Sequence, residues 1–329
     1  MNSKRWIALV IVIALVVVSF GVRMTTQVAS SIVNGVLDFD NSTYEAKIVE
    51  EGDWDEQIAI IDLQGAIMDD DTSPLLGQGY NHHRMLTTID QAAQDDTVKA
   101  VLLKIDSPGG AVGETAEIYE ALKEMQEEFD KPLFVAMEGM AASGGYYAAA
   151  PADKIYAQAS TITGSIGVIM ESINFAGLAE KYGISFNTIK SGKHKDIMSA
   201  SREMTEEEKE ILQSMIDEMY DDFVEVIVDG REMSDKEVRK LADGRIYTGK
   251  QAKEVGLVDE VGSLDDALVD LRESYDLENA QVIKYSKDAG FFTYFNVDAK
   301  SIFGAKDEEI DAVMSLLRQS DKPRAMYIY

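Results

Sequence analysis

Apolar and polar positions alternate along the middle of the chain in the manner expected of strands that alternate with helices. Short apolar runs predict buried strands, and apolar residues spaced by three and four predict amphipathic helices. The predicted strands are 57–68, 98–105, 132–137, 154–157 and 184–189. The predicted helices are 82–94, a segment that starts at Ala111, the small residues up to Ala150, and 175–182. This order favours an α/β fold with parallel strand pairing.

The second half of the chain is more helical. A long amphipathic helix is predicted after Thr205, with apolar residues that recur as far as Ile227. Hydroxyl residues followed three positions later by Glu or Gln have the spacing of capping boxes, which satisfy backbone N–H groups at helix starts. These pairs are Thr205/Glu208, Ser234/Glu237 and Thr248/Gln251. After Tyr285 the pattern weakens into a tail that ends in apolar, β-prone residues.

An apolar run of 17 uncharged residues, 6–22, lies between Arg5 and Arg23. As a helix it would be about 25 Å long, close to the thickness of the hydrocarbon core of a membrane. Lys4 and Arg5 precede it, so the positive-inside rule predicts a cytoplasmic N-terminus and an exported remainder. The run therefore predicts a single-pass anchor, and the alternative is a cleaved signal peptide. Residues 24–55 are polar with little periodicity and are expected to form a stalk.

Charge and composition exclude several classes of function. Asp and Glu number 59 against 31 Lys and Arg, which gives a formal net charge of −28. A field of that sign repels phosphate backbones, so no nucleic-acid partner is expected. The chain has no Cys, only three His and no HExxH motif, so neither thiol chemistry nor a metal site is expected. Hydrolytic chemistry would have to rest on Ser, Thr, Lys, Asp, Glu or Tyr.

Two of the predicted strand-to-helix turns carry a pair of glycines, Gly109-Gly110 and Gly144-Gly145. Glycine allows a sharp turn and lets a ligand approach the backbone N–H groups, and two facing turns could hold a developing oxyanion. Neither turn has the GxGxxG motif and no P-loop sequence occurs, so no nucleotide cofactor is expected. Ser143 stands at the tip of the second turn, where it is either a nucleophile or an ordinary helix cap.

A serine nucleophile needs a general base, and the residues alone leave its identity open. His82 and His83 lie in a polar stretch and are expected to be solvated, and His194 lies between two lysines. A lysine can act as a base only where desolvation keeps its amine neutral. The segment 191–196, Ser-Gly-Lys-His-Lys-Asp, contains two candidate lysines.

Five blocks of sequence resemble, in the same order, those of the SppA signal peptide peptidases, which are membrane-anchored Ser-Lys proteases of the ClpP/crotonase superfamily. The blocks are Asp106–Gly110, Met140–Tyr147, Thr163–Gly167, Ser191–Asp196, and Ala242–Ala252 with Gly256–Asp259. Each block alone is weakly specific, whereas five in order behind an apolar N-terminal run are highly specific. The match extends over roughly two-thirds of the chain. Long members have two copies of the domain, so this chain, with one copy, is similar to the short bacterial type.

The resemblance implies a ClpP/crotonase-like core of repeated ββα units behind an N-terminal transmembrane helix. The implied organisation is an anchor at 1–23, a stalk at 24–55, a protease domain at 56–285 and a partly flexible tail at 286–329. Short members of the family close into homo-oligomeric rings, in which the serine and the lysine can come from neighbouring subunits. A ring is therefore the assembly that the resemblance implies for this chain.

The resemblance also implies the roles of individual residues. Ser143 would be the nucleophile, and Lys195, which directly precedes an aspartate, would be the general base, with Lys193 as its rival. Ser165 would orient the lysine amine. The backbone N–H groups of the oxyanion hole would be those of Gly110 and Gly144. No metal or cofactor takes part in such a mechanism.

The implied function is a serine endopeptidase that degrades remnant signal peptides and other apolar, extended peptides at the cell membrane, with its catalytic domain outside the cytoplasm. One alternative is a crotonase-type acyl-CoA enzyme, which the export signal and the acidic charge oppose. Another is a non-catalytic or regulatory membrane scaffold. Residues 326–329 are apolar and β-prone, so we expect the tail to lie in the active-site groove or to be trimmed by the enzyme, rather than to fray.

Overall fold

The computed structural model describes residues 44–69, 80–286 and 325–329 of the chain. Its described elements belong to one unit, Glu45–Tyr329. The apolar run 6–22 lies outside the described residues, and so does most of the predicted stalk. Within the described residues, no helix combines the length and the apolar character that crossing a membrane requires.

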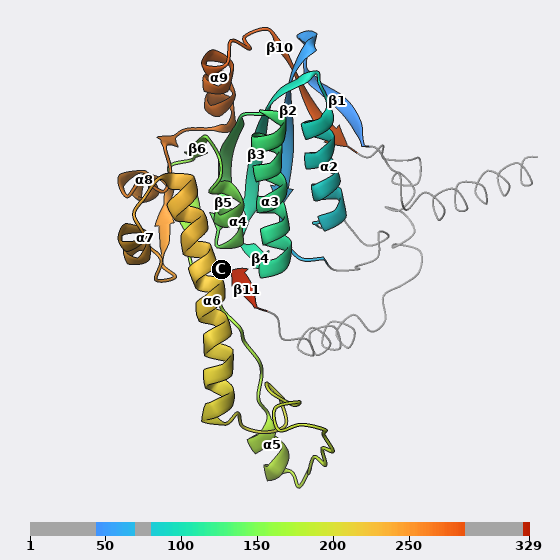
Figure 1. Cartoon of the computed structure of the whole chain (residues 1–329), viewed down its shortest axis with the longest axis vertical. Coiled ribbons are helices and arrows are strands. Elements are labelled where there is room, and N and C mark those ends of the chain that lie inside the picture. The colour runs from blue at the N-terminus through green and yellow to red at the C-terminus, as the bar shows by residue number, and fades with distance from the viewer. Residues whose placement is uncertain (1–43, 70–79, 287–324) are drawn as a thin grey trace, which may run out of the picture. The chain divides into compact units, whose positions relative to one another are not determined.

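The described elements follow the predicted alternation closely (Figure 1). The strands are β1 (Glu45–Glu50), β2 (Asp53–Gln64), β3 (Val98–Ser107), β4 (Gly109–Ala111), β5 (Leu133–Ala142), β6 (Lys154–Ala157), β7 (Ile162–Gly164), β8 (Ile246–Thr248), β9 (Glu260–Val261), β10 (Ala280–Ser286) and β11 (Met326–Ile328). The helices are α2 (His82–Gln94), α3 (Val112–Phe129), α4 (Gly144–Ala149), α5 (Ala176–Lys181), α6 (Glu206–Arg231), α7 (Asp235–Leu241), α8 (Gly249–Glu254) and α9 (Leu264–Ser274).

A large sheet of parallel strands organises this unit. Its strands follow the order β1-β10-β2-β3-β5-β6-β9, and β7 joins β5 to β8. Among the described pairs of this sheet, β1 with β10 and β7 with β8 are antiparallel, and the rest are parallel. A separate two-stranded sheet pairs β11 with β4. The predicted α/β class with parallel pairing is confirmed.

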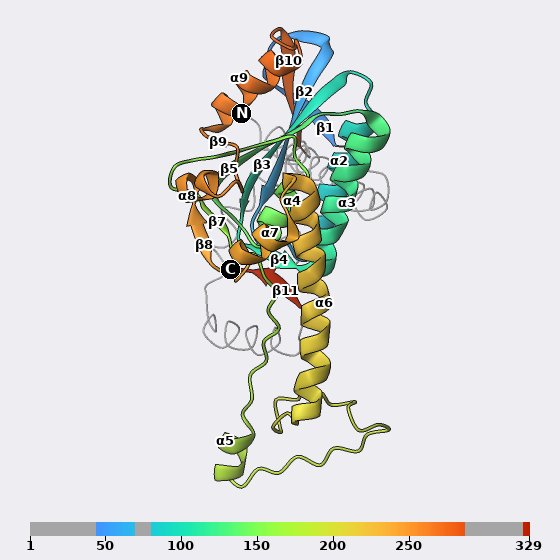
Figure 2. The ribbon, with the colours of Figure 1, turned by 60° about the vertical axis from the view of Figure 1, so that its left-hand side comes forward.

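Helices cover both faces of the sheet, which explains why the central strands are continuous apolar runs. Successive side chains of a strand point to opposite faces. Leu102 of β3 belongs to a buried cluster with Leu271 of α9, whereas its neighbour Leu103, also fully buried, faces the other way. Figures 1 and 2 show α2, α3 and α4 on the face opposite α9.

The long helix α6 begins well away from the sheet (Figures 1 and 2). Its first turn is closed by the predicted capping box of Thr205 with Glu208. In its second half Phe223, Val224, Val226 and Ile227 are buried, whereas Ile211 and Met215 of its first half are exposed. Residues 170–205, which contain α5, lie beside that first half, and we call this segment with the first half of α6 the projecting arm.

Two sequence predictions about the elements are wrong. Residues 184–189 form no strand; they lie in the projecting arm, where Ile184, Phe186 and Ile189 are exposed. The pattern of these residues is strand-like, but none of the strands in the described part of the chain pairs with them. Residues 45–55, expected as part of the stalk, instead form β1 and the start of β2, because β10 supplies pairing partners for both.

His82 also differs from its expectation, because it is buried rather than solvated. Its Nδ1 lies 2.7 Å from the Tyr80 hydroxyl and its Nε2 lies 2.7 Å from a carboxylate oxygen of Glu117. These two partners satisfy both ring nitrogens, which allows a polar ring to be buried at the start of α2. His83, its neighbour, is exposed as expected.

Candidate active site

Ser143 occupies the junction between β5 and α4, and its backbone is strained. Its φ of 53° and ψ of −117° fall in a region that residues other than glycine rarely adopt. The Ser143 N–H donates to the carbonyl oxygen of Gly164 at 2.7 Å, which anchors this conformation to the end of β7. Strained residues of this kind persist where the surrounding structure enforces them, and they are concentrated at functional sites.

The Ser143 hydroxyl is buried and has no partner. The residue is 1% exposed, and its Oγ has no hydrogen-bond partner among the described residues. Ser143 holds the N-cap position of α4 but makes no side-chain capping bond, so the alternative of an ordinary helix cap is not supported. A buried hydroxyl without a partner is costly, and it remains available to a substrate or to a base.

Ser165 lies beside Ser143 because β5 and β7 are paired in parallel register. Ala142 is opposite Gly164 in that register, so the residues that follow them leave the two strands side by side. Ser165 is buried, has a φ of 51°, and donates its N–H to the carbonyl oxygen of Arg245 at 2.8 Å. The structure therefore brings together the two serines that the sequence analysis selected.

The two glycine turns meet at Ser143. Gly109 has a φ of 95°, and a Cβ added to it would lie 2.6 Å from the backbone nitrogen of Gly144. A Cβ on Gly144 would in turn lie 3.1 Å from the backbone nitrogen of Gly110. Gly144 opens α4, and the first N–H groups of a helix have no partner within the helix. The N–H groups of Gly110 and Gly144 thus lie close to each other beside Ser143.

An extended segment of the chain itself lies along this site. Strand β11, near the C-terminus, pairs in antiparallel register with β4, and Tyr327 is opposite Gly110. On its other side Met326 exchanges two backbone hydrogen bonds with Ile169, at 2.9 and 3.0 Å. Residues 326–328 are therefore held between two backbone segments and are not frayed.

The side chain of Tyr327 fills a deep aromatic pocket. It is 1% exposed and stacks on Tyr147 at a ring-centroid distance of 5.1 Å, with Phe223 of α6 at 4.7 Å. Its hydroxyl donates to the carbonyl oxygen of Met219 at 2.9 Å. Burial raises the pKa of this hydroxyl above its usual range, so the group is a neutral donor. The pocket accepts a large aromatic side chain and satisfies its polar end.

The carbonyl group of Tyr327 points to the glycine turns. A Cβ added to Gly109 would lie 2.0 Å from the Tyr327 carbonyl oxygen, in addition to its close approach to the Gly144 nitrogen. A peptide carbonyl, two glycine N–H groups and a free serine hydroxyl therefore gather at one place. This is the arrangement expected where an oxyanion is to be stabilised.

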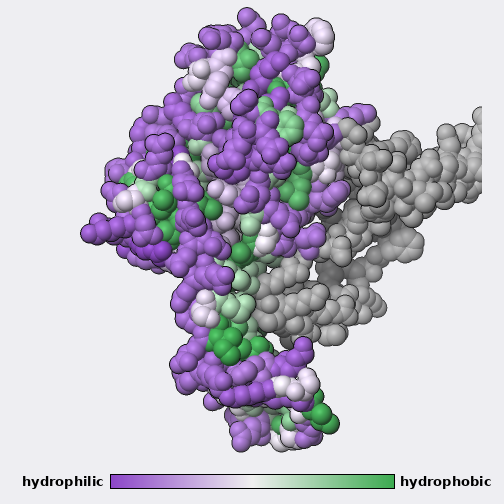
Figure 3. All heavy atoms as spheres, viewed as in Figure 1, coloured by the Kyte–Doolittle hydropathy of each residue, from purple (hydrophilic) through white to green (hydrophobic). Residues whose placement is uncertain are grey.

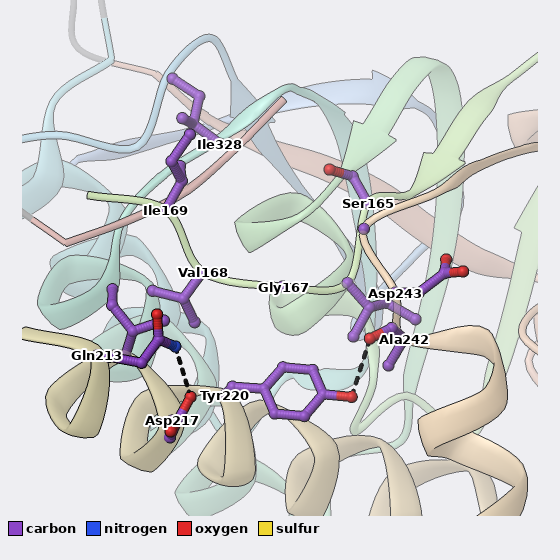
Figure 4. A pocket seen from close by; sticks show the side chains of 13 residues that line it. Ser165, Gly167, Val168, Ile169, Gln213, Asp217, Tyr220, Ala242, Asp243 and Ile328 are labelled. Carbon is purple, nitrogen blue, oxygen red and sulfur yellow. Dashed lines mark hydrogen bonds between the residues drawn. The ribbon is translucent and has the colours of Figure 1, made fainter. Parts of the chain in front are cut away.

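A cavity of about 430 Å³ continues the groove beyond Tyr327 (Figure 4). Ile328 and Ile169 lie next to each other on one side of it, and Ser165 lies on another. Tyr220 of α6 forms part of its floor and donates from its hydroxyl to the carbonyl oxygen of Ala242 at 2.9 Å. The cavity offers space for residues that follow the one in the aromatic pocket.

Lys195 lies in another part of the unit. It belongs to the segment between α5 and α6, which Lys193 joins to Glu207 at the start of α6. Ser143 directly precedes α4, which lies by the second half of α6 (Figures 1 and 2). Between Glu206 and Phe223 the helix rises about 25 Å, which a lysine side chain cannot span. One chain therefore does not bring Lys195 to Ser143.

The two candidate lysines of the arm differ in their surroundings. Lys193 forms an ion pair with Glu207. His194 lies 3.3 Å from Glu207 and 3.6 Å from Glu208. Lys195 is exposed and has no ion-pair partner among the described residues. Of the two lysines, Lys195 is therefore the one whose amine is not engaged by a carboxylate of its own chain.

Sequence reasoning missed the residues that line the aromatic pocket. Tyr147 lies within the block 140–147 that carries Ser143, so its proximity to the serine could have been inferred. Phe223 and Met219 come from the amphipathic stripe of α6, which gives no sign of where along the helix the contact with α4 lies. Ile169 lies in a segment with no element pattern of its own.

Comparison with known proteins agrees with the geometry. The model of peptidase family S49 matches residues 125–278. The "Putative signal peptide peptidase SppA" of Enterococcus faecium is 37% identical over 342 residues, covering 100% of this chain and 99% of that protein. The chain belongs to peptidase family S49. The full-length match makes it an SppA-type protease, as the five sequence blocks predicted, and the family match includes Ser143, Ser165 and Lys195.

Two further relatives of this S49 chain are longer proteins. "Protease 4" of Haemophilus influenzae is 30% identical over 292 residues, which cover 83% of this chain and 46% of that protein. "Serine protease SPPA, chloroplastic" of Arabidopsis thaliana is 34% identical over 216 residues, covering 65% of this chain and 32% of the relative. The similarity to these longer proteases therefore covers less than half of their length.

Proposed function

We propose that this S49 peptidase is a membrane-anchored serine endopeptidase in which Ser143 is the nucleophile and Lys195 is the general base. The observation that carries the proposal is the Ser143 hydroxyl, which is buried, unpaired among the described residues and held in a strained turn beside β4. A hydroxyl in that state is ready to attack a carbonyl group bound along β4.

The strand β11 supports a specific mode of substrate binding. An extended peptide would add a strand between β4 and the segment at Ile169, with one large side chain in the aromatic pocket. Its carbonyl oxygen would then receive the N–H groups of Gly110 and Gly144. Main-chain pairing tolerates many sequences, whereas the aromatic pocket selects apolar residues. Remnant signal peptides, which are apolar and can be extended, fit this chemistry.

The catalytic step follows from these groups. The neutral Lys195 amine takes the proton of the Ser143 hydroxyl while the Ser143 oxygen forms a bond to the carbonyl carbon of the substrate. The two glycine N–H groups stabilise the negative charge that develops on the carbonyl oxygen. The amine of the departing peptide then takes the proton from the lysine. Water, activated in the same way, releases the acyl group from Ser143. Ser165, beside Ser143, is suited to orient the lysine amine.

Lys195 and Ser143 are far apart within one chain. We therefore also propose that the chain forms a homo-oligomeric ring, in which Ser143 of one copy meets Lys195 of a neighbouring copy. The exposed apolar side chains of the projecting arm support this assembly, because a surface of that kind on a soluble domain marks an interaction site. Figure 3 shows apolar surface gathered on the arm. The residues concerned are Ile173, Phe175, Leu178, Tyr182, Ile184, Phe186 and Ile189.

The N-terminal run completes the proposal. Residues 6–22 would anchor the enzyme with the catalytic domain outside the cytoplasm, close to the membrane in which signal peptides remain after export. Protease added to intact cells should then digest the domain. Complete protection of the domain under conditions that leave the cells intact would contradict this topology.

The test of the nucleophile is labelling of the full-length protein in detergent with a fluorescent fluorophosphonate. Wild type should be labelled at Ser143, and Ser143→Ala should give no label. The neighbouring Ser165→Ala variant is the matched control, because it removes a buried hydroxyl from the same site but leaves the nucleophile; it should be labelled more slowly at Ser143. Label on Ser143→Ala at the wild-type rate would refute the assignment.

A further inference from the structure

One arginine fixes the loop that carries Lys195. The Arg202 guanidinium donates to both carboxylate oxygens of Asp196, from Nε at 3.0 Å and from Nη2 at 2.6 Å. Nη2 also donates to the backbone carbonyl oxygen of Asp196 at 3.1 Å. Because Asp196 directly follows Lys195, these three bonds hold the backbone on which the lysine is mounted.

The same guanidinium reaches the start of α6. It donates to Glu208 from Nη1 at 2.8 Å and from Nη2 at 2.6 Å, and the Glu208 side chain is only 2% exposed. Glu208 also accepts the N–H of Thr205 at 3.0 Å as part of the capping box. A planar guanidinium can serve two carboxylates in this way, whereas an ammonium group cannot. Arg202 thus ties the Lys195 loop to the first turn of α6.

A third connection anchors Arg202 itself. Its backbone carbonyl oxygen accepts from the Asn174 side chain at 2.9 Å, and Phe175 donates its N–H to the carbonyl oxygen of Ala200 at 2.9 Å. The loop, the helix start and the segment before α5 are therefore joined through one residue.

The network also determines which charges face the lysine. Hydrogen bonds from Arg202, and then from Lys190 at 2.5 Å, hold the pKa of Asp196 well below its usual range. Arg202 does the same for Glu208. Each carboxylate is thus ionised and already has a cation partner. Two further charged groups near the loop have carboxylate neighbours: Lys193 pairs with Glu207, and His194 lies beside Glu207 and Glu208.

We propose that Arg202 is the positioning residue of Lys195, which fixes its loop and keeps the carboxylates of Asp196 and Glu208 away from its amine. The inference rests on the proposed role of Lys195 as the base. A carboxylate released beside the lysine would stabilise the ammonium form, which cannot accept a proton. Arg202 would therefore act on the reaction without touching the substrate.

The test is the second-order rate of fluorophosphonate labelling of Ser143 in the full-length protein, measured across pH for a set of variants. Arg202→Met should label at least about 10-fold more slowly at neutral pH, with the midpoint of its pH–rate profile raised by about one unit or more. Adding Asp196→Asn to Arg202→Met should move the midpoint back toward wild type without restoring the full rate. Arg202→Lys should keep the wild-type midpoint and lower the rate, because the positive charge remains but the planar guanidinium that donates to both carboxylates is lost.

The matched control is Arg272→Met. Arg272 donates to the Ala280 carbonyl oxygen at 3.3 Å and pairs with Glu50 at 3.0 Å, so it too joins a carboxylate to a backbone carbonyl, but on α9. Its labelling rate and midpoint should equal those of wild type. Light scattering on every variant checks that the assembly is intact.

The outcomes separate this inference from the proposed function. An unchanged midpoint in assembled Arg202→Met, even with a lower rate, would overturn the positioning role and indicate a purely structural one. If Arg202→Met does not fold, Arg202→Lys decides: a wild-type rate there overturns the inference. Labelling of Lys195→Ala at the wild-type rate would instead overturn the role of Lys195 as the base.

Discussion

Tyr327 lies opposite Gly110 in antiparallel register, so the end of the chain forms a strand on the backbone beside Ser143. The tyrosine ring enters the pocket of Tyr147 and Phe223, and its carbonyl oxygen approaches the two glycine turns. The tail thus occupies the site in the way that we propose for a substrate. The position of Tyr327 also identifies the bond that would be cut, the one between Tyr327 and Ile328.

The first prediction is that the enzyme trims its own tail at that bond. Wild-type protein incubated in detergent should lose the dipeptide Ile328-Tyr329, because the Tyr327 carbonyl already lies at the glycine turns. Intact-mass measurement checks this, with Ser143→Ala as the control that keeps its full mass. Wild-type protein that keeps its full mass after long incubation, as Ser143→Ala keeps its own, would show that β11 occupies the groove without being cleaved.

The second prediction concerns the space at Gly109. A Cβ there would lie 2.0 Å from the Tyr327 carbonyl oxygen and 2.6 Å from the Gly144 nitrogen, and the φ of 95° is unfavourable for alanine. Gly109→Ala should therefore lose peptidase activity by several orders of magnitude, because the oxyanion site is blocked. The measurement is kcat/KM on an apolar fluorogenic peptide.

Gly113→Ala is the matched control for that substitution. Gly113 lies in the first turn of α3, four residues further along, and a Cβ there would have no atom within 4 Å. The variant should keep wild-type kcat/KM and gain up to about 1 kcal/mol of stability, because alanine favours the helix. If Gly109→Ala is as active as Gly113→Ala, the glycine turns do not form the oxyanion site.

The third prediction separates the lysines of the arm. Lys195→Ala should lower kcat by several orders of magnitude, and Lys195→Arg should be nearly as inactive, because a guanidinium does not lose its proton at workable pH. Lys193→Ala should be close to wild type, since Lys193 is paired with Glu207. The wild-type rate should rise with pH, because the neutral amine is the active form. Full activity in Lys195→Ala would assign the base to another residue.

Much of the fold could be predicted because the signals were local. The residues 82–94 form α2 as predicted, and 154–157 form β6. The capping boxes at Thr205, Ser234 and Thr248 all start helices, since the side chain and the backbone that it caps lie within four residues. Parallel pairing was predicted from the alternation of strands with helices along the chain.

The failures have a common cause, which is the lack of tertiary information in a local pattern. Residues 184–189 have the composition of a strand but pair with no strand that the structure describes, and 45–50 have the composition of a linker but pair with β10. His82 is buried because Tyr80 and Glu117, one of them on another helix, satisfy its ring. None of these partners is visible in the residues themselves.

The candidate site was predictable in part, because some of its residues are indicated by local sequence patterns. Ser143, Gly110 and Gly144 come from turns that follow neighbouring parallel strands, so their convergence follows from the predicted sheet. Ser165 follows β7, a short strand that the sequence pattern did not predict. The strain at Ser143 and the position of the Tyr327 ring depend on packing that no motif encodes. The separation of Lys195 from Ser143 depends on where along its 26 residues the helix α6 contacts α4.

The most direct test of the account mixes two inactive proteins. Ser143→Ala and Lys195→Ala chains, dissociated and reassembled together, should recover peptidase activity that neither has alone, because some sites will join an intact Ser143 to the intact Lys195 of a neighbour. Each variant reassembled with itself is the control, and light scattering with two affinity tags establishes that mixed assemblies form. Mixed assemblies without activity would contradict a catalytic pair formed between chains.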